Sequence, residues 1–534
     1  MEMPEFKSPW WREYRRRMYR HRERLSNEQI FRKSLKENSK EYFRNCTLAG
    51  MNHFTGHGVS LLERAFWAVM LGLVIGMLFY CLAYIWGNLS QPLIVTMESS
   101  TYDIGNIDFP AVAICNINRV SRRAIDHIAA TAFDDVKYGF DDDKFNISYF
   151  KWLVGQTGRL INFEYSESFD KNISSLDKLN GNFDPRNLIQ IMETVSPNCS
   201  EMLLRCTWAG RVTPCERLFA VRRTVRGHCC AFNYILNYDG AKSTIAKSKR
   251  QTVRGPRNGL NVLMDPLKDD YQFPLHPMVG FEVFLFDPTH FADLNGGRVV
   301  HRFIDINAGK LMQLQSRKQL ATDEVRKYSL ETRKCLFHDD YYSVYRGMYS
   351  MSACIIRCRI KTVLSLCKCV PYFLPTRDHE PVCSLDNLRC LNKYREKFMF
   401  LFPVSAESEA GLEQDMHDSM FCPECAADCE HTQHSSQAST LELTSTRWPG
   451  KHHLGPFFND VNFTGLCFMS VFQPTQDGVL DRLDVVYYWF ELLSNVGGFG
   501  GVLLGFSMIT IVEIVYFTCI RFVIIMRSNY IAYH

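Results

Sequence analysis

The chain has 534 residues, of which 46% are hydrophobic and 22% are charged, and its formal net charge at pH 7 is +4. This length is enough for several hydrophobic cores and excludes a single small domain, but it does not show where domain boundaries lie. The small net charge averages over segments of different character, so by itself it indicates no class of partner.

Residues 1–64 form a polar leader rich in Lys and Arg, with the run WWREYRRRMYRHRER near its start. Such a run can bind nucleic acid or direct nuclear import. An uncharged apolar stretch follows the leader, however, and Lys and Arg beside a membrane span are typical of its cytoplasmic side. We therefore predict a cytoplasmic N-terminal leader and no nucleic-acid partner.

Residues 65–87 contain no charged side chain and predict the first transmembrane helix. At about 1.5 Å per residue this helix would extend roughly 34 Å, enough to cross a hydrocarbon core of about 30 Å. The stretch begins far from the N-terminus and lacks a small-residue cleavage site, so it predicts a retained span in the lipid bilayer rather than a signal peptide.

Residues 88–484 contain all of the twenty cysteines except Cys46, Cys81 and Cys519. This distribution indicates an oxidising compartment, where disulfides are favoured over zinc or redox sites for close pairs such as CPEC and CKC. We therefore expect no metal site and no resident cofactor. Five N-x-S/T sequons in the same segment also predict an extracellular domain, with N-glycosylation at Asn88, Asn146, Asn172, Asn198 and Asn462.

The extracellular segment contains both strand-like and helix-like patterns. Short aromatic or β-branched runs at residues 109–114, 279–286 and 464–472 predict strands. Helical periodicity at residues 323–330 and 349–364 predicts helices, so the segment is expected to be α+β. The chain lacks the H-E-x-x-H and G-x-S-x-G motifs and any clear catalytic constellation, so we predict no enzyme activity.

Residues 485–526 form a second apolar stretch, whose only charged residues are Glu491, Glu513 and Arg521. It is too long for one straight span, so it predicts a tilted or broken transmembrane helix, followed by a short cytoplasmic tail at residues 527–534. Two crossings place both termini on the cytoplasmic side.

Glycines are concentrated within this second stretch, at Gly497, Gly498, Gly500, Gly501 and Gly505. A glycine costs about 1 kcal/mol in a helix interior relative to alanine, so the segment is poised to unwind or to pack closely against a neighbour. Unwound backbone at membrane depth is tolerated where it is buried in protein or lines water. The glycines alone therefore fit either a pore or the close packing of a membrane anchor.

The order of ten cysteines resembles the thumb of the degenerin and epithelial sodium channel family. The sequence motifs around these cysteines are most similar to the insect pickpocket branch of that family. Further segments resemble the same family, namely FPAVAICN, CTWAGRVTPC, GHCCAFN, YSMSACIIRCR and CVPYFLP. The ten cysteines are Cys335, Cys354, Cys358, Cys367, Cys369, Cys383, Cys390, Cys422, Cys425 and Cys429.

The resemblance implies a set of disulfides that cysteine spacing alone does not determine. The implied pairs are Cys115–Cys229, Cys206–Cys215, Cys335–Cys429, Cys354–Cys425, Cys358–Cys422, Cys367–Cys390 and Cys369–Cys383. Of the remaining cysteines in the segment, we expect Cys199 to pair with Cys230, which leaves Cys467 as a free thiol.

The resemblance also implies roles for residues of the second apolar stretch, which looks like the family's pore helix. Gly505, Phe506 and Ser507 match the selectivity filter, and Ser494 matches the degenerin position, where side-chain bulk holds channels open. Gly497, Gly498, Gly501 and Glu513 belong to the implied pore helix, with Glu513 just below the filter. Tyr516 stands where relatives often carry a second acid, which lowers the inner-pore charge.

The N-terminal leader resembles the family at a gating motif that is altered here. The segment CTLAGMNHF places Ala49 and Gly50 where the family has His-Gly, at the family's distance before Trp67. The nearby His57-Gly58 dipeptide lies too close to Trp67 to be this motif. We therefore expect Ala49 and Gly50 to form the variant gating motif.

The resemblance implies a two-pass α-helical membrane protein with a large disulfide-rich ectodomain, assembled as a homotrimer or as a heterotrimer with related subunits in the plasma membrane. The expected function is a voltage-independent, amiloride-sensitive channel for Na⁺, gated through the ectodomain by an unidentified extracellular ligand, by force or by another sensory stimulus. The alternatives are an ATP-gated type of trimeric channel, which the cysteine order and pore helix do not favour, and a non-conducting two-pass receptor or accessory subunit.

Overall fold

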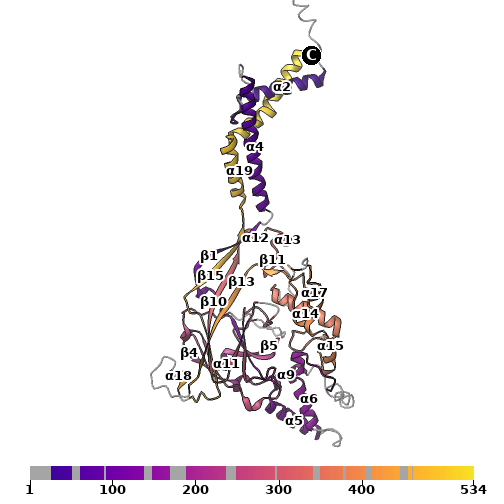
Figure 1. Cartoon of the computed structure of the whole chain (residues 1–534), viewed down its shortest axis with the longest axis vertical. Helices are drawn as coiled ribbons and strands as arrows, with labels where there is room; N and C mark the ends of the chain where they lie inside the picture. The colour runs from indigo at the N-terminus through magenta and orange to yellow at the C-terminus, as the bar shows by residue number, and fades with distance from the viewer. Residues whose placement is uncertain are drawn as a thin grey trace, which may run out of the picture. The chain divides into compact units, whose positions relative to one another are not determined.

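The computed structural model describes residues 26–50, 60–89, 92–137, 147–168, 188–235, 248–294, 298–340, 349–376, 380–403, 406, 410–444, 455–459 and 461–533. The chain divides into two compact units (Figure 1). The first unit combines Met1–Ile94 with Val485–His534, and the second is Val95–Asp484.

The described part of the first unit is helical, and two of its segments are long and apolar enough to cross a membrane, Leu61–Gly87 and Met508–Ala532. Their apolar side chains are largely exposed on the single chain, as expected for helices that face lipid or other subunits. The elements are α2 (Asn27–Asn45), α4 (Leu61–Leu89), α19 (Trp489–Leu504), α20 (Met508–Val515), the π-helix η8 (Tyr516–Arg521) and α21 (Phe522–Tyr533).

The second apolar stretch is interrupted once, between α19 and α20. Four of the five clustered glycines lie within helix α19, and the interruption is confined to Gly505, Phe506 and Ser507. The helix after the interruption continues through Tyr533, past the predicted end at residue 526. Similarly, α4 begins at Leu61 rather than at residue 65.

The second unit is built on an eight-stranded mixed sheet with the order β1-β15-β10-β14-β7-β3-β4, in which β13 also pairs with β10. Its strands are β1 (Leu93–Asp103), β3 (Leu203–Trp208), β4 (Arg211–Thr213), β7 (Leu260–Met264), β10 (Ala308–Ala321), β13 (His431–Glu442), β14 (Cys467–Phe472) and β15 (Asp477–Val485).

A five-stranded sheet of the order β5-β6-β2-β8-β9 packs against the larger one. Its strands are β2 (Ala111–Asn116), β5 (Phe219–Thr224), β6 (Gly227–Phe232), β8 (Gly280–Phe286) and β9 (Val300–Asp305), and β11 (Cys335–Leu336) pairs separately with β12 (Ala427–Asp428). The core between the sheets includes Ile114, Val283 and Met469. Strands β2, β8 and β14 are buried along their whole length, which explains their unbroken apolar sequences.

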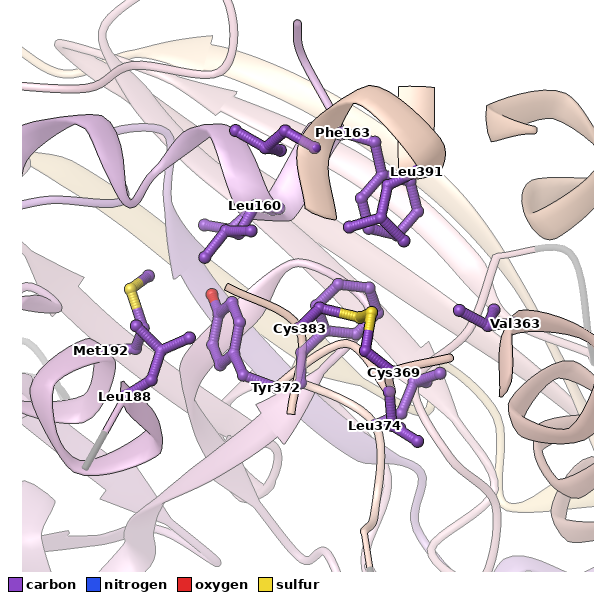
Figure 2. Close-up of a cluster of buried hydrophobic side chains, with 14 of the residues drawn as sticks. Leu160, Phe163, Leu188, Met192, Val363, Cys369, Tyr372, Leu374, Cys383 and Leu391 are labelled. Atoms are coloured by element: carbon purple, nitrogen blue, oxygen red, sulfur yellow. A yellow bond between two sulfur atoms is a disulfide. The ribbon is translucent and has the colours of Figure 1, made fainter. Parts of the chain in front are cut away.

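Helices cover one side of the second unit around a separate core (Figure 2). Figure 2 shows the Tyr372 side chain among the labelled residues of this core. A Cβ on Gly227 would lie 2.8 Å from the Tyr372 hydroxyl oxygen, which favours glycine at that position. The larger helices are α5 (Arg122–Lys137), α6 (Ile147–Gln156), α9 (Leu188–Val195) and α14 (Met351–Cys367).

Short helices complete the second unit. The predicted helix at residues 323–330 is replaced by two of them, α12 and α13, because the chain leaves helical geometry around Tyr328. The short α-helices are α7 (Arg159–Asn162), α10 (Cys199–Met202), α11 (Cys215–Leu218), α12 (Asp323–Arg326), α13 (Leu330–Arg333), α15 (Leu388–Lys393), α16 (Arg395–Met399), α17 (Glu413–Asp418) and α18 (Gly455–Phe458). The 3-10 turns are η1 (Ile104–Asn106), η4 (Pro256–Asn258), η5 (Lys268–Asp270) and η6 (Leu385–Asn387).

The second unit contains eight disulfides, and seven of them join the partners that the family resemblance implies. The bonds are Cys115–Cys229, Cys199–Cys230, Cys206–Cys215, Cys335–Cys429, Cys354–Cys425, Cys358–Cys422, Cys367–Cys390 and Cys369–Cys383. Cys354 and Cys358 lie one turn apart on α14, so both face the segment that carries their partners. Cys467 is a free, buried cysteine.

Two of the sequon asparagines, Asn198 and Asn462, are exposed on the second unit. The Asn198 side chain also caps helix α10 by accepting a hydrogen bond from the Ser200 N–H. The side chains of Asn88, Asn146 and Asn172 lie outside the described residues, as does His57.

Candidate functional site

The interruption of the second span begins at Gly505, which adopts a left-handed backbone conformation with φ of +66°. Its N–H donates to the Gly501 carbonyl over 3.0 Å, and the Phe506 N–H donates to the Gly500 carbonyl over 3.1 Å. These bonds satisfy carbonyls at the end of α19 that would otherwise lack partners. A Cβ on Gly500 would lie 3.5 Å from that of Phe506, so the chain folds back closely on this glycine.

Helix α20 begins after Ser507, whose side chain caps it. The Ser507 Oγ accepts from the Thr510 N–H, and the Ser507 N–H donates to the Thr510 Oγ1 over 3.2 Å. This reciprocal arrangement supports a helix start in the middle of an apolar stretch. The Thr510 side chain is fully buried.

A segment from the other end of the chain lies against this interruption. We call residues 46–50 the N-terminal loop. The Ala49 N–H donates to the Leu504 carbonyl over 3.0 Å, on the α19 side of the interruption. On the α20 side, the Thr47 N–H and hydroxyl both donate to the Glu513 carboxylate. The loop thus holds both sides of the broken span.

The loop geometry accounts for both members of the variant gating motif. Gly50 has a φ of +83°, a conformation that favours glycine, and the position of its missing Cβ lies 3.8 Å from the Trp67 ring. Ala49 and the Thr47 carbonyl oxygen both lie 3.8 Å from the position that a Cβ on Gly505 would occupy. The structure therefore brings together Ala49, Gly50, Gly505, Ser507 and Glu513.

Of the remaining predicted site residues, Phe506 lies in the interruption itself and Gly501 lies one turn before Gly505, whose N–H it accepts. Ser494 is an exposed residue of α19. Apart from the backbone of α19 itself, a Cβ on Gly497 or Gly498 would meet no atom of the described residues within 4 Å, and one on Gly501 would meet the Phe506 carbonyl oxygen at 3.5 Å. The face of α19 that carries Gly497 and Gly498 is therefore open on the single chain.

Helix α2 also packs against the far end of the second span (Figure 1), and the sequence analysis did not identify this contact. The Asn38 side-chain amide donates to the Phe517 carbonyl over 3.1 Å, and Arg521 forms an ion pair with Glu41 at 2.6 Å. The Asn529 amide donates to Ser34 and Glu37. The spacing of Ile30, Ser34 and Asn38 and the capping box at Ser26 were the available sequence signals.

The second unit contains a buried cluster of charges around Glu282 on β8. The fully buried Glu282 carboxylate is bonded by Arg119, Arg226 and His301. Burial alone would raise the pKa of Glu282, but the hydrogen bond from His301 and the two guanidinium charges lower it to about 2. The carboxylate is therefore ionised at neutral pH, and its contacts with these three side chains connect β8 to three other segments of the chain.

Comparisons with known proteins agree with these features. The family model described as "Amiloride-sensitive sodium channel" matches residues 42–517. Pickpocket protein 28 of Drosophila melanogaster is 24% identical, covering 92% of this chain and 79% of its own length. Sodium channel protein Nach of Drosophila ananassae is 23% identical over 96% of this chain and 92% of its own, and acid-sensing ion channel 1C of Danio rerio is 21% identical over 89% and 82%. The chain therefore belongs to the amiloride-sensitive sodium channel family of trimeric membrane channels with two spans, and it is not an enzyme.

Proposed function

We propose that the chain is a subunit of a trimeric, voltage-independent, amiloride-sensitive channel that conducts Na⁺ across the plasma membrane. Its ectodomain, residues 88–484, receives a ligand, mechanical or other sensory stimulus, and both termini are cytoplasmic. The observation that carries the proposal is the single interruption of the second span at Gly505–Ser507, because non-helical backbone at membrane depth requires protein or water around it.

Gly505, Phe506 and Ser507 form the selectivity filter in this proposal. Three copies around an axis supply rings of carbonyl and hydroxyl oxygens that replace part of the hydration shell of Na⁺. The Glu513 carboxylate adds negative charge on the inner side of this ring, and a carboxylate within a span is typical of an ion pathway.

Helix α19 lines the outer part of the pathway in this proposal. The open face at Gly497 and Gly498 allows the α19 helices of neighbouring subunits to approach closely, because a Cβ at either glycine would meet no side chain of the described residues within 4 Å. Ser494 lies one turn before Gly498 and is exposed, which supports its assignment as the gate.

The test is whole-cell recording from cells that express Ser494→Phe. We expect a sustained, voltage-independent Na⁺ current that amiloride blocks, because a bulky residue at the gate prevents closure. Ser435→Phe makes the same change at an exposed serine of β13 and is expected to produce no sustained current. If Ser494→Phe reaches the surface and conducts nothing, a homomeric channel is contradicted.

A non-conducting or accessory subunit is the second candidate, and the alanine at position 49 favours it, since the family has histidine at this position. Co-expression with a related subunit separates the two candidates. A current that depends on Ser494→Phe and appears only in the co-expressed pair indicates an obligate heterotrimer.

A further inference from the structure

The second span contains a wide helical turn in addition to its interruption. The π-helix η8 (Tyr516–Arg521) lies between α20 and α21, and the Phe522 N–H donates to the carbonyl of Phe517, five residues earlier. Such turns are rare and occur mostly as single turns inside α-helices. A turn closed between residues five apart takes up one residue more than an α-helical turn. The residues of α21 are therefore set back by one position, about 100° of rotation and about 1.5 Å of length, from their places in a continuous α-helix.

Two polar side chains bond to carbonyls of this wide turn. The Asn38 Nδ2 of α2 donates to the Phe517 carbonyl oxygen over 3.1 Å, so this oxygen accepts from both Asn38 and the Phe522 N–H. The Thr518 Oγ1 donates to the Ile514 carbonyl oxygen over 2.6 Å. Side-chain donors that bond to helix carbonyls stabilise departures from regular α-helical geometry. The wide turn is therefore stabilised in part by α2, from outside the span.

Further contacts with α2 lie at the end of the wide turn and after it. Arg521 Nη2 forms an ion pair with Glu41 Oε1 at 2.6 Å. The Asn529 Nδ2 donates to the Ser34 Oγ over 3.0 Å and to the Glu37 Oε2 over 2.8 Å. Arg521 and Asn529 face α2 in the set-back register, so these bonds depend on the wide turn.

A continuous α-helix would present other side chains to α2. Each place would be taken by the preceding residue, so Ile520 would replace Arg521, and Ser528 would replace Asn529. Isoleucine cannot pair with the Glu41 carboxylate, and serine offers one hydroxyl in place of an amide with two donor hydrogens. The polar face of α2 therefore binds the set-back register more strongly than the continuous one.

We propose that η8 is a two-register switch controlled by α2: bound α2 holds the segment as a π-helix, and loss of its bonds makes the segment α-helical and turns α21 by about 100°. The contact contains a weakness that keeps the two registers close in free energy. The Asn38 Oδ1 is buried and has no hydrogen-bond partner among the described residues, which is unfavourable. The switch concerns the conformation of the span and does not depend on whether the chain conducts.

Cross-linking between α2 and α21 reports the register. One variant of the purified full-length protein carries Ser34→Cys with Asn529→Cys, and a second carries Ser34→Cys with Ser528→Cys. Both are oxidised with copper phenanthroline, and the linked peptides are quantified by mass spectrometry. We expect the Asn529→Cys pair to cross-link faster, because Asn529 and not Ser528 bonds to Ser34. The background has serine in place of the free cysteines of the first unit, Cys46, Cys81 and Cys519.

Asn38→Leu with Glu41→Gln, added to both variants, weakens the bonds that select the π-helix. We expect the ratio of the two cross-linking rates to shift about tenfold towards the Ser528→Cys pair, because hydrogen bonds to charged groups are strong. An unchanged ratio would overturn the proposal. Equal loss of both cross-links would also overturn it, since α2 would then detach without a change of register.

The matched control makes the same two kinds of substitution on α2 away from the span. Asn45→Leu changes an exposed position, and Glu28→Gln changes a carboxylate that pairs with Arg32 of the same helix. The ratio is expected to stay at the parent value. A shift equal to that of Asn38→Leu with Glu41→Gln would contradict control by these contacts.

Deletion of one residue from the wide turn tests the register independently. Without Thr518 the segment is one residue shorter, and a continuous α-helix then leaves Asn529 facing Ser34. We expect the Asn529→Cys cross-link to persist and the ratio to become insensitive to the α2 substitutions. Deletion of Ile524 from α21 is the control, since it turns Asn529 away from α2 and should abolish the cross-link. Loss of the cross-link in both deletions would overturn the proposal.

Discussion

The two units of the chain are stabilised by different kinds of interaction. The unit Val95–Asp484 has eight disulfides, two sheets with fully buried strands, and a buried carboxylate bonded by two arginines and a histidine. In the other unit, Cys46, Cys81 and Cys519 are free, and hydrogen bonds join the N-terminal loop and α2 to the broken second span. A covalent framework resists rearrangement, whereas a few hydrogen bonds around an interrupted helix can exchange. The difference predicts that the unit Val95–Asp484 is the more rigid of the two.

Among the changes proposed here, removal of one disulfide is expected to have the largest effect on the stability of the second unit. Cys335→Ser with Cys429→Ser opens a loop with a sequence separation of 94 residues. We expect a loss of about 2–5 kcal/mol of stability, seen as a lower unfolding temperature and reduced surface expression. Cys519→Ser removes a free, exposed cysteine and serves as the control. Unchanged stability of the double variant would show that the framework does not depend on this bond.

Acid is expected to weaken the second unit through its buried histidines. Burial lowers the pKa of His434 to about 4, against an ordinary value of 6.5, although nearby Asp287 and Asp108 oppose this shift. The neutral ring therefore contributes full stability above about pH 6.5. As the pH falls from 6.5 towards 4, the unfolded chain takes up a proton that the folded chain does not, and stability decreases.

His434→Gln should flatten this decrease by at most about 1.4 kcal/mol per pH unit, measured as unfolding temperature between pH 7 and pH 4.5. The His434 ring bonds to the Ser316 hydroxyl at 2.8 Å, so the variant is also expected to be less stable at neutral pH. His417→Gln changes an exposed histidine and is the control. A pH profile of His434→Gln parallel to that of the parent would contradict the assignment.

The smallest effect is expected at the contact between α2 and the π-helix η8. Asn38→Leu removes the amide that donates to the Phe517 carbonyl and leaves this acceptor without its side-chain partner. We expect hydrogen exchange in η8 and α21 to become about tenfold faster, corresponding to about 1.4 kcal/mol, without a change in the second unit. Asn45→Leu, an exposed position on the same helix, provides the control. Equal protection in both variants would show that Asn38 does not stabilise the C-terminal end of the second span.

Much of the second unit could be predicted because its signals are local or belong to the family pattern. The run GFEVFLF predicts a buried strand and forms β8, and the family resemblance implies seven bonds that the structure contains. The prediction of one helix at residues 323–330 was wrong, because periodicity over eight residues does not distinguish one helix from two short ones. The α14 helix was predicted correctly since its apolar face spans several turns.

The first unit could be predicted only in outline. Length and glycine content predict a broken span, but they place the unwinding over a wider region than Gly505–Ser507. Four of the glycines lie within helix α19. The cost of about 1 kcal/mol for each glycine is not enough to prevent a helix that neighbouring residues stabilise. Thr47 could not be identified, because nothing near it in the sequence marks a partner 466 residues away. The same holds for Asn38 and its bond to the Phe517 carbonyl.

The contact between Thr47 and Glu513 has a consequence for biosynthesis. At about 5–20 residues per second, the ribosome needs roughly 20–90 seconds to synthesise the 466 residues that separate them. During this interval the N-terminal loop and the polar face of α2 exist without the span that they later hold. The contacts of the N-terminal loop and α2 with the second span are therefore completed last, after the disulfide-containing unit has been synthesised, and Thr47, Asn38 and Glu41 lack these partners until then.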